Sequence, residues 1–242
     1  MGNIKYNDVI RSISYDQHEI LYNIMKMHNN GKPFDCDITY STGKFYGKFN
    51  VETLDGNKAE IEIPQPKFKF DVCPQSDDVV QIEDGKPLPL EDNSISSIVV
   101  DLPFVVSPHT APSILNDNGD KKKNIIFKRF SSYYPWHTMP QSYSRWLKEC
   151  YRVLKNEGIV VWKSQSTISG SKNIMMPYYS WMEAEKNGFY TLDEFIILAK
   201  NRLHSGKIKK QEHARKFHSH FFVFKKSLRE KPINYYKWLE KK

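Results

Sequence analysis

The sequence has few cysteines and no long hydrophobic run. Its three cysteines, Cys36, Cys73 and Cys150, are too few and too widely spaced for a disulfide framework or a CxxC metal knuckle. The longest apolar runs, such as 98–100, are far below the ~18 residues that cross a membrane. The first ten residues lack the apolar segment of a secretory signal, and Tyr6 stands where a myristoylation signal needs Ser or Thr. We therefore expect a soluble, reduced, cytoplasmic protein.

The chain also lacks internal repeats and any linker rich in Pro, Gly or Ser. We therefore expect its 242 residues to form a single domain over 1–242. Hydrophobic residues make up only 39% of the chain, but 14 Phe, 14 Tyr and 5 Trp supply large side chains for a core. This content of aromatic residues argues against a disordered chain.

Positive charge is concentrated in three segments. The chain carries 36 basic and 28 acidic residues, a net charge of +8. Segments 121–129, 201–216 and 225–242 each carry a net +5, so the remainder carries a net −7. Such separation of charge suits a polyanionic partner, although solvated lysine-rich loops have the same composition.

The pattern of apolar residues predicts alternating strands and helices. Helical spacing appears over 15–29, 140–155 and 177–187. Strand patterns appear over 34–40, 67–72, 79–82, 97–101, 159–162, 189–198 and 218–224, and a hairpin is expected over 45–63 around Asp55-Gly56. Asn156-Glu157-Gly158 is expected to be the turn between a helix and a buried strand. The fold class that follows is α/β with a mostly parallel sheet.

Acidic residues follow four of the predicted strands. They are Asp37, Asp71, Asp84 and Asp101. Ligands of open parallel sheets collect beyond the carboxyl ends of the strands, so these acids are placed where a nucleoside cofactor would bind. Each of them alone is equally typical of a turn or a cap.

Several motifs resemble those of class I S-adenosylmethionine (SAM)-dependent methyltransferases, and in particular of the DNA methyltransferases that methylate amino groups. Asp101-Leu102-Pro103-Phe104 resembles their catalytic Asp/Asn/Ser-Pro-Pro-Tyr/Phe tetrapeptide. The segment 149–158, ECYRVLKNEG, is similar to the helix and turn that precede their fifth strand. The resemblance runs from about 34 to 225 and implies a Rossmann-like fold with an antiparallel closing strand.

The resemblance also implies where SAM would bind. Segment 37–43 is similar to the Asp-x-Phe-x-Gly-x-Gly cofactor loop, with departures at Thr39 and Ser41. Asp37 would pair with the ammonium of SAM, and Gly43 would let the backbone approach the ligand. By the same resemblance, Asp71 would accept the ribose hydroxyls and Asp84 the adenine amino group. The expected cofactor residues are Asp37, Thr39, Ser41, Gly43, Asp71 and Asp84.

The tetrapeptide has a chemical logic that fits an amino group of a base. The lone pair of such an amine is delocalised into the ring, so acceptors for its two N–H groups favour the nucleophilic form. The carboxylate of Asp101 and a carbonyl at Leu102 would be these acceptors, and Phe104 after Pro103 would stack on the base. The base would have to be flipped out of a duplex. No metal is needed.

A basic and aromatic segment, 105–139, follows the tetrapeptide and is a candidate nucleic-acid recognition element. Interleaved cations and rings suit phosphate contact and base stacking. The candidate contact residues are Lys121, Lys122, Lys123, Lys128, Arg129, Tyr133, Tyr134 and Trp136. We interpret His213, His218 and His220 as surface or base-contact histidines rather than metal ligands.

The sequence thus predicts a SAM-dependent methyltransferase that acts on a DNA amino base, adenine N6 ahead of cytosine N4. Two alternatives stay open at this point. One is a methyltransferase for RNA or a small molecule, and the other is a nucleic-acid-binding protein that has this fold without catalysis.

Overall fold

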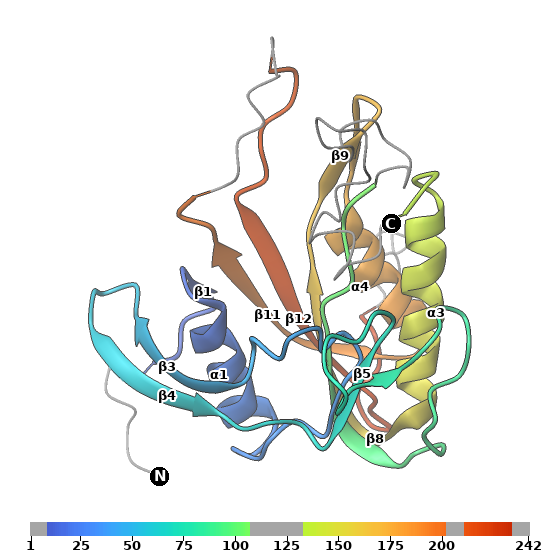
Figure 1. The fold of residues 1–242 in the computed structure, drawn as a ribbon, viewed down its shortest axis with the longest axis horizontal. Coiled ribbons are helices and arrows are strands. Elements are labelled where there is room, and N and C mark those ends of the chain that lie inside the picture. Colours follow the sequence, from blue (N-terminus) through green and yellow to red (C-terminus); the bar gives the residue numbers. More distant parts are fainter. Residues whose placement is uncertain (1–8, 107–132, 202–210, 234–242) are drawn as a thin grey trace, which may run out of the picture.

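The computed structural model describes residues 9–106, 133–201 and 211–233. Eight strands of these ranges form one sheet (Figure 1). They are β1 (Ile13–Ser14), β2 (Cys36–Asp37), β5 (Phe68–Asp71), β6 (Val80–Gln81), β7 (Ile95–Val100), β8 (Leu154–Ser164), β11 (Tyr190–Leu198) and β12 (His218–Lys225). The spatial order is β1-β11-β12-β8-β7-β2-β5-β6.

Only one strand of this sheet runs against the others. The pairs β6·β5, β5·β2, β2·β7, β7·β8 and β1·β11 are parallel. β12 is antiparallel to both of its neighbours, β8 and β11. The order and the directions confirm the expected α/β class, with the Rossmann-like class I methyltransferase arrangement and its antiparallel closing strand.

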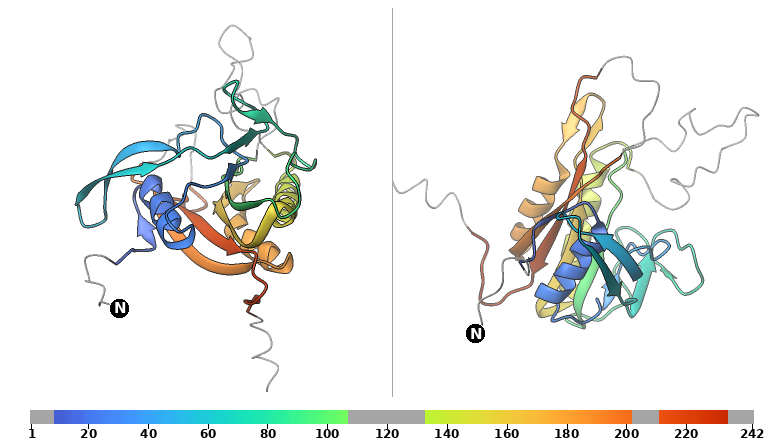
Figure 2. Two further views of the ribbon diagram at one scale, coloured as in Figure 1. Left: turned by 90° about the horizontal axis from the view of Figure 1, so that it is seen from below. Right: turned by 90° about the vertical axis from the view of Figure 1, so that its left-hand side faces the viewer.

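Alternation along the central strands divides the core between two faces of the sheet. Ile98, Val100, Val160 and Trp162 belong to the cluster under α3 (Thr138–Val153) and α4 (Met176–Lys186). Val99 and its neighbours on β8 and β12 pack instead on the face covered by α1 (Gln17–His28). Because successive side chains of a strand point to opposite faces, a wholly apolar strand serves both helical layers. Figure 2 shows α1 lying apart from α3.

The helix α1 confirms the predicted amphipathic segment. The carboxylate of Asp16 caps its first turn by accepting from the backbone N–H of His18 at 2.8 Å. Ile20, Leu21 and Ile24 are buried against the sheet. A hairpin of β3 (Gly47–Glu52) and β4 (Lys58–Ile63) is also confirmed, and it extends from the same side of the molecule (Figure 1).

The structure differs from the predicted elements at four places, of which the unpredicted short strand β1 is the first. The predicted strand 34–40 is only Cys36–Asp37, because the following backbone turns to bond to acidic side chains. The predicted turn at 156–158 lies within β8 as an irregularity, where Glu157 has φ +67° and its N–H bonds to the carbonyl of Lys226. A small hairpin of β9 (Thr167–Ser169) and β10 (Lys172–Ile174) was not predicted.

The helices of the described ranges are amphipathic or short. None of them is both long enough and apolar enough to cross a membrane.

Candidate active site

Asp101 follows the last residue of β7 at the carboxyl edge of the sheet. Its backbone N–H donates to the hydroxyl of Thr39 at 2.8 Å. That hydroxyl donates in turn to the Oδ1 atom of Asp37 at 3.1 Å. The parallel pairing of β2 with β7 places the two strand ends side by side, so this chain of hydrogen bonds fixes the first residue of the tetrapeptide.

Asp37 supports the site from within the core. It is fully buried, and its Oδ2 atom accepts from the hydroxyl of Tyr46 at 2.7 Å. Burial raises the pKa of the Asp37 carboxyl to about 7, against the lowering effect of the hydrogen bonds from Tyr46 and Thr39. Both oxygens of Asp37 accept hydrogen bonds from protein groups in this arrangement, and the expected ion pair with the ammonium of SAM stays a prediction.

Lys163 is a site residue that sequence reasoning missed. Its Nζ atom lies 2.8 Å from the Oδ2 atom of Asp101, and the pair is only partly exposed. The rings of Phe45 and Phe221 lie 5.3 and 5.6 Å from the ammonium. Lys163 follows the apolar run 159–162 on the strand next to β7, so a cation at the end of a predicted buried strand was the available signal.

The other residues of the tetrapeptide differ in how far they are buried. Leu102 is buried, whereas Phe104 is partly exposed. The hydroxyl of Tyr143 contacts the carbonyl oxygens of Leu102 and Pro103 at 3.4 and 3.3 Å. Tyr143 belongs to α3, so this helix supports the backbone of the tetrapeptide directly.

A small cavity lies where the carboxyl ends of β2, β5 and β7 meet. Seven of the expected cofactor and catalytic residues line it: Thr39, Ser41, Asp71, Asp84, Asp101, Leu102 and Pro103. Apolar side chains, including those of Ile38, Val72 and Trp146, complete the lining. The tertiary structure thus brings most of the expected cofactor and catalytic residues together.

The acids of this cavity already have protein partners. Asp71 is buried and accepts backbone N–H groups from Ser41 and Cys73, each at 2.7 Å. Asp84 is more exposed and forms an ion pair with Arg145 at 2.7 Å. Ser41 has φ +52°, a left-handed conformation that glycine adopts more readily. This backbone geometry explains why the family pattern has glycine at that position.

Gly43 is required for packing within the protein. It has φ +67°, and a Cβ atom there would overlap the hydroxyl and ring of Tyr40. Gly43 is not among the residues that line the cavity. Its expected contact with a ligand stays a prediction.

The lining of the cavity fits the chemical groups of a nucleoside sulfonium, but the volume of the cavity is too small for one. Carboxylates suit its hydroxyl and amino groups, and apolar side chains suit its adenine ring. The volume of the cavity is about 40 Å³, far below the roughly 300–1,000 Å³ of typical ligand sites. Binding of SAM therefore requires the cavity to widen.

A much larger groove also reaches the tetrapeptide. Its volume is about 1,000 Å³, and Phe104 and Lys163 are among the residues that line it. The remaining walls come from the segments after β8 and β11 and from the start of β12. The residues 101–104 therefore border both a small acidic cavity and a wide groove.

The structure treats the candidate nucleic-acid residues in three groups: some lie outside the described residues, two are exposed and one is buried. Lys121, Lys122, Lys123, Lys128 and Arg129 lie outside the described residues. Tyr134 and Trp136 are 62% and 44% exposed, which keeps them available for contact. Tyr133 corrects the prediction, because it is buried, donates to Ser142 at 3.2 Å and lines the small cavity.

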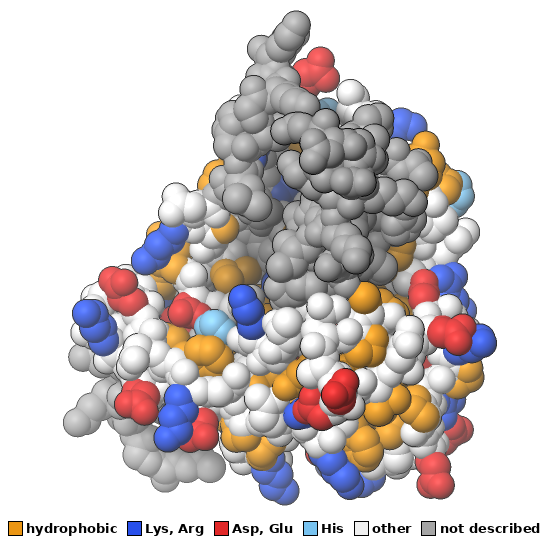
Figure 3. Space-filling view, viewed as in Figure 1, with side chains coloured by type: hydrophobic (Ala, Val, Ile, Leu, Met, Phe, Trp, Pro, Cys, Tyr) orange, Lys and Arg blue, Asp and Glu red, His pale blue; other side chains and the backbone are white. Residues whose placement is uncertain are grey.

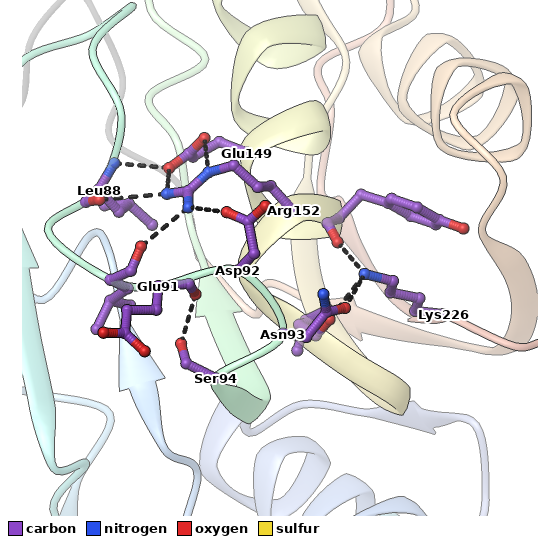
Figure 4. Close-up of polar contacts among 11 residues, drawn as sticks. Leu88, Glu91, Asp92, Asn93, Ser94, Glu149, Arg152 and Lys226 are labelled. Atoms are coloured by element: carbon purple, nitrogen blue, oxygen red, sulfur yellow. Dashed lines mark hydrogen bonds and ion pairs between the residues drawn. The ribbon is translucent and has the colours of Figure 1, made fainter.

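The segment 149–158 supports the site from a distance. The guanidinium of Arg152 donates to Glu149, to Asp92 and to the carbonyls of Leu88 and Leu90 (Figure 4). Glu149 also accepts from the backbone N–H of Leu88. The helix α3 thereby fixes the loop that leads into β7, which accounts for the Glu and Arg of this motif.

Metal ligands do not cluster within the described ranges. No group of three or more His, Cys, Asp or Glu side chains is arranged there to hold a metal ion. His218 and His220 share a face of β12 with ring centroids 5.3 Å apart, and His220 pairs with Glu194 at 2.6 Å.

No protein-family model and no curated protein sequence matches the chain. Two crystal structures of a Thermus thermophilus protein, named "Putative DNA Modification Methylase", match with 13% and 12% identity and TM-scores of 0.35 and 0.38. The matches cover 60% and 64% of this chain and 51% and 55% of the other, about half of its length. At these values, the fold assignment depends on the strand order and directions given above.

Proposed function

We propose that this protein transfers a methyl group from SAM to an exocyclic amino group of a DNA base, adenine N6 ahead of cytosine N4. One observation carries the proposal: Asp101, Leu102 and Pro103 line the small acidic cavity, and Phe104 lines the wide groove. Methyl transfer is an in-line displacement, so the sulfonium methyl group and the acceptor nitrogen must meet in direct contact beside the catalytic group. The tetrapeptide borders both openings, so a donor in one and a base in the other would meet beside it.

Each residue then has a chemical task. SAM, when bound, supplies an electrophilic methyl group. Asp71 and Asp84 would accept hydrogen bonds from its hydroxyl and amino groups. The carboxylate of Asp101 would accept an N–H of the target amine and direct its lone pair toward the methyl group, and Phe104 would stack on the base.

A methyl-transfer assay tests the proposal. The full chain is incubated with SAM labelled in its methyl group, on duplex DNA, single-stranded DNA, RNA or no substrate. We expect labelled DNA, with the label on adenine N6. Asp101→Ala should lower turnover by roughly 10²–10³-fold, because it removes an acceptor that acts mainly in the transition state. Asp77→Ala, at an exposed acid outside the cavity, is the matched control.

Two results would overturn parts of this proposal. Full activity of Asp101→Ala would show that the tetrapeptide is not catalytic. Binding of SAM without transfer to any nucleic acid would favour a small-molecule substrate.

A second function is favoured by the size of the cavity. At about 40 Å³ the cavity is closed to SAM, and Asp101 is paired with Lys163. These features suit a nucleic-acid-binding protein that has this fold and no transferase activity. Calorimetry decides between the two functions: micromolar binding of SAM supports the enzyme, and no heat at millimolar SAM supports the binding protein.

A further inference from the structure

The wide groove has the composition of a nucleic-acid site that the tetrapeptide does not explain. Arg215 and Lys216 line it from the segment that leads into β12. Among the charged side chains that line the groove, Lys163, Arg215 and Lys216 are cations and Glu212 is an anion. Positive grooves bind the phosphates of a nucleic-acid strand and release counterions.

The inner part of the groove carries polar groups in a buried setting. Gln165, Ser166 and Ser219 line it with side chains at most 9% exposed. The hydroxyl of Ser219 donates to the Oε1 atom of Gln165 at 3.0 Å. Amide and hydroxyl groups held in this way can exchange hydrogen bonds with the edges of a base.

Two segments that line the groove are joined to neighbouring elements by hydrogen bonds. The Nε2 atom of His213 lies 2.9 Å from the carbonyl oxygen of Ser171, which connects the 211–217 segment to the β9–β10 hairpin. The backbone N–H of Ala199 bonds to the carbonyl of Phe217 at 2.7 Å. Figure 1 shows both segments extending toward the same end of the sheet.

The position of the groove favours one form of nucleic acid. Phe104 and Lys163 line it, and Lys163 is paired with Asp101. A base that remains stacked in a duplex cannot enter such a recess, and flipping it out costs a few kcal/mol that a single strand does not have to supply. A positive groove with an aromatic side chain at its end is the arrangement used by proteins that bind single strands.

We propose that this groove binds a short single-stranded stretch of DNA, with Arg215 and Lys216 on its phosphates and a base directed toward Phe104. This inference deepens the proposed function by naming the form of the substrate. It concerns binding alone, so its test uses neither SAM nor turnover.

The experiment is fluorescence anisotropy of the full chain with a labelled single-stranded DNA 12-mer, a hairpin duplex of the same sequence and the matching RNA 12-mer. We expect the single strand to bind more tightly than the duplex. The double variant Arg215→Ala/Lys216→Ala should flatten the slope of log affinity against log salt by about 1.4. At 0.1 M salt, this change corresponds to an affinity for the single strand that is lower by roughly twentyfold.

Two further variants serve as controls. Lys48→Ala/Lys186→Ala removes the same charge at exposed positions outside the groove and should leave the slope nearly unchanged. Figure 3 shows acidic side chains mixed with basic ones over the lower part of the face it presents. Arg215→Lys/Lys216→Arg keeps both charges and should retain the slope.

The outcomes separate the groove from catalysis. Equal losses in the two alanine doubles, or tighter binding of the duplex, would overturn the proposal. Tighter binding of the RNA 12-mer would support the groove and assign it to RNA. Loss of single-strand binding in Arg215→Ala/Lys216→Ala supports the groove even if no methyl transfer is found. Methyl transfer together with an unchanged salt slope would support the proposed function and overturn the proposal for this groove.

Discussion

At the residue scale, the pairing of Asp101 determines what the tetrapeptide can do. One carboxylate oxygen is 2.8 Å from the ammonium of Lys163, so the other oxygen remains for a target amine. The ion pair orients the carboxylate and balances its charge. Lys163 is therefore a positioning residue that acts through Asp101.

Replacement of Lys163 by methionine should reduce kcat without changing the affinity for SAM. The methionine fills a similar volume but leaves Asp101 without its cationic partner, and small errors in orientation cost about tenfold or more in rate. Lys163→Arg should recover part of the rate. Lys186→Met, which removes an exposed partner of Glu183 at 3.7 Å, should leave kcat as it is. Equal kcat for Lys163→Met and the unaltered chain would contradict this role.

A comparison of Gly43 with Gly56 separates the cost of left-handed backbone strain from the cost of steric overlap by a Cβ atom. Both have a positive φ, but a Cβ atom at Gly56 would meet nothing within 4 Å. Gly56→Ala should therefore cost only about 1–2 kcal/mol of left-handed strain. Gly43→Ala should cost about 1–3 kcal/mol more, because its Cβ would overlap the ring of Tyr40. Urea denaturation of both variants measures the difference, and equal midpoints would show that Tyr40 moves aside freely.

At the scale of elements, α3 connects the core to both the tetrapeptide and the loop before β7. Tyr143 contacts the backbone of the tetrapeptide, and Arg152 holds the loop two turns further along. The ammonium of Lys226 donates to the carbonyls of Tyr151 and Leu154 at the end of the same helix (Figure 4). The sequence motif of this helix is thus explained by support of the site.

Arg152→Met should lower the free energy of unfolding by about 2 kcal/mol, because its partners lose charge-assisted hydrogen bonds in a half-buried setting. The expected fall in Tm is about 4–8 °C for a chain of this size. Arg145→Met on the same helix breaks a more exposed pair with Asp84 and should cost less than about 1 kcal/mol. Thermal denaturation compares the two, and a larger loss for Arg145→Met would refute this account.

At the scale of the whole molecule, the buried Asp37 makes stability depend on pH. Its folded pKa of about 7 lies above the ordinary value of 3.8, so the folded state holds this proton more tightly than the unfolded state. Between about pH 4 and pH 7 the folded chain therefore binds more protons. The contribution of Asp37 to the free energy of unfolding falls as pH rises through this window and is constant above it.

Asp37→Asn should flatten this dependence. The amide keeps an acceptor for Thr39 and offers a donor to the hydroxyl of Tyr46, but it does not titrate. In the unaltered chain, Asp37 lowers the free energy of unfolding by at most about 1.4 kcal/mol for each rise of one pH unit, the value for one proton. Asp37→Asn should remove this contribution. Urea denaturation between pH 4 and pH 8 measures it. A slope that is the same in both proteins would show that Asp37 is not the titrating group.

The sequence by itself determined the layers of this protein. Helical periodicity located α1, α3 and α4, and apolar runs located the central strands, because local patterns reflect which face is buried. Asp71 and Asp101, at the ends of β5 and β7, line one cavity together with Asp84, since parallel strands end at the same edge of a sheet.

Only the tertiary structure decided what these residues contact. Asp37 and Tyr133 look like ligand-binding residues in the sequence, but packing encloses both. The pairing of Lys163 with Asp101 joins residues on neighbouring strands, and the groove joins segments after β8 and β11 with the start of β12. Such contacts depend on the order of strands in space, and a local pattern carries no information about that order.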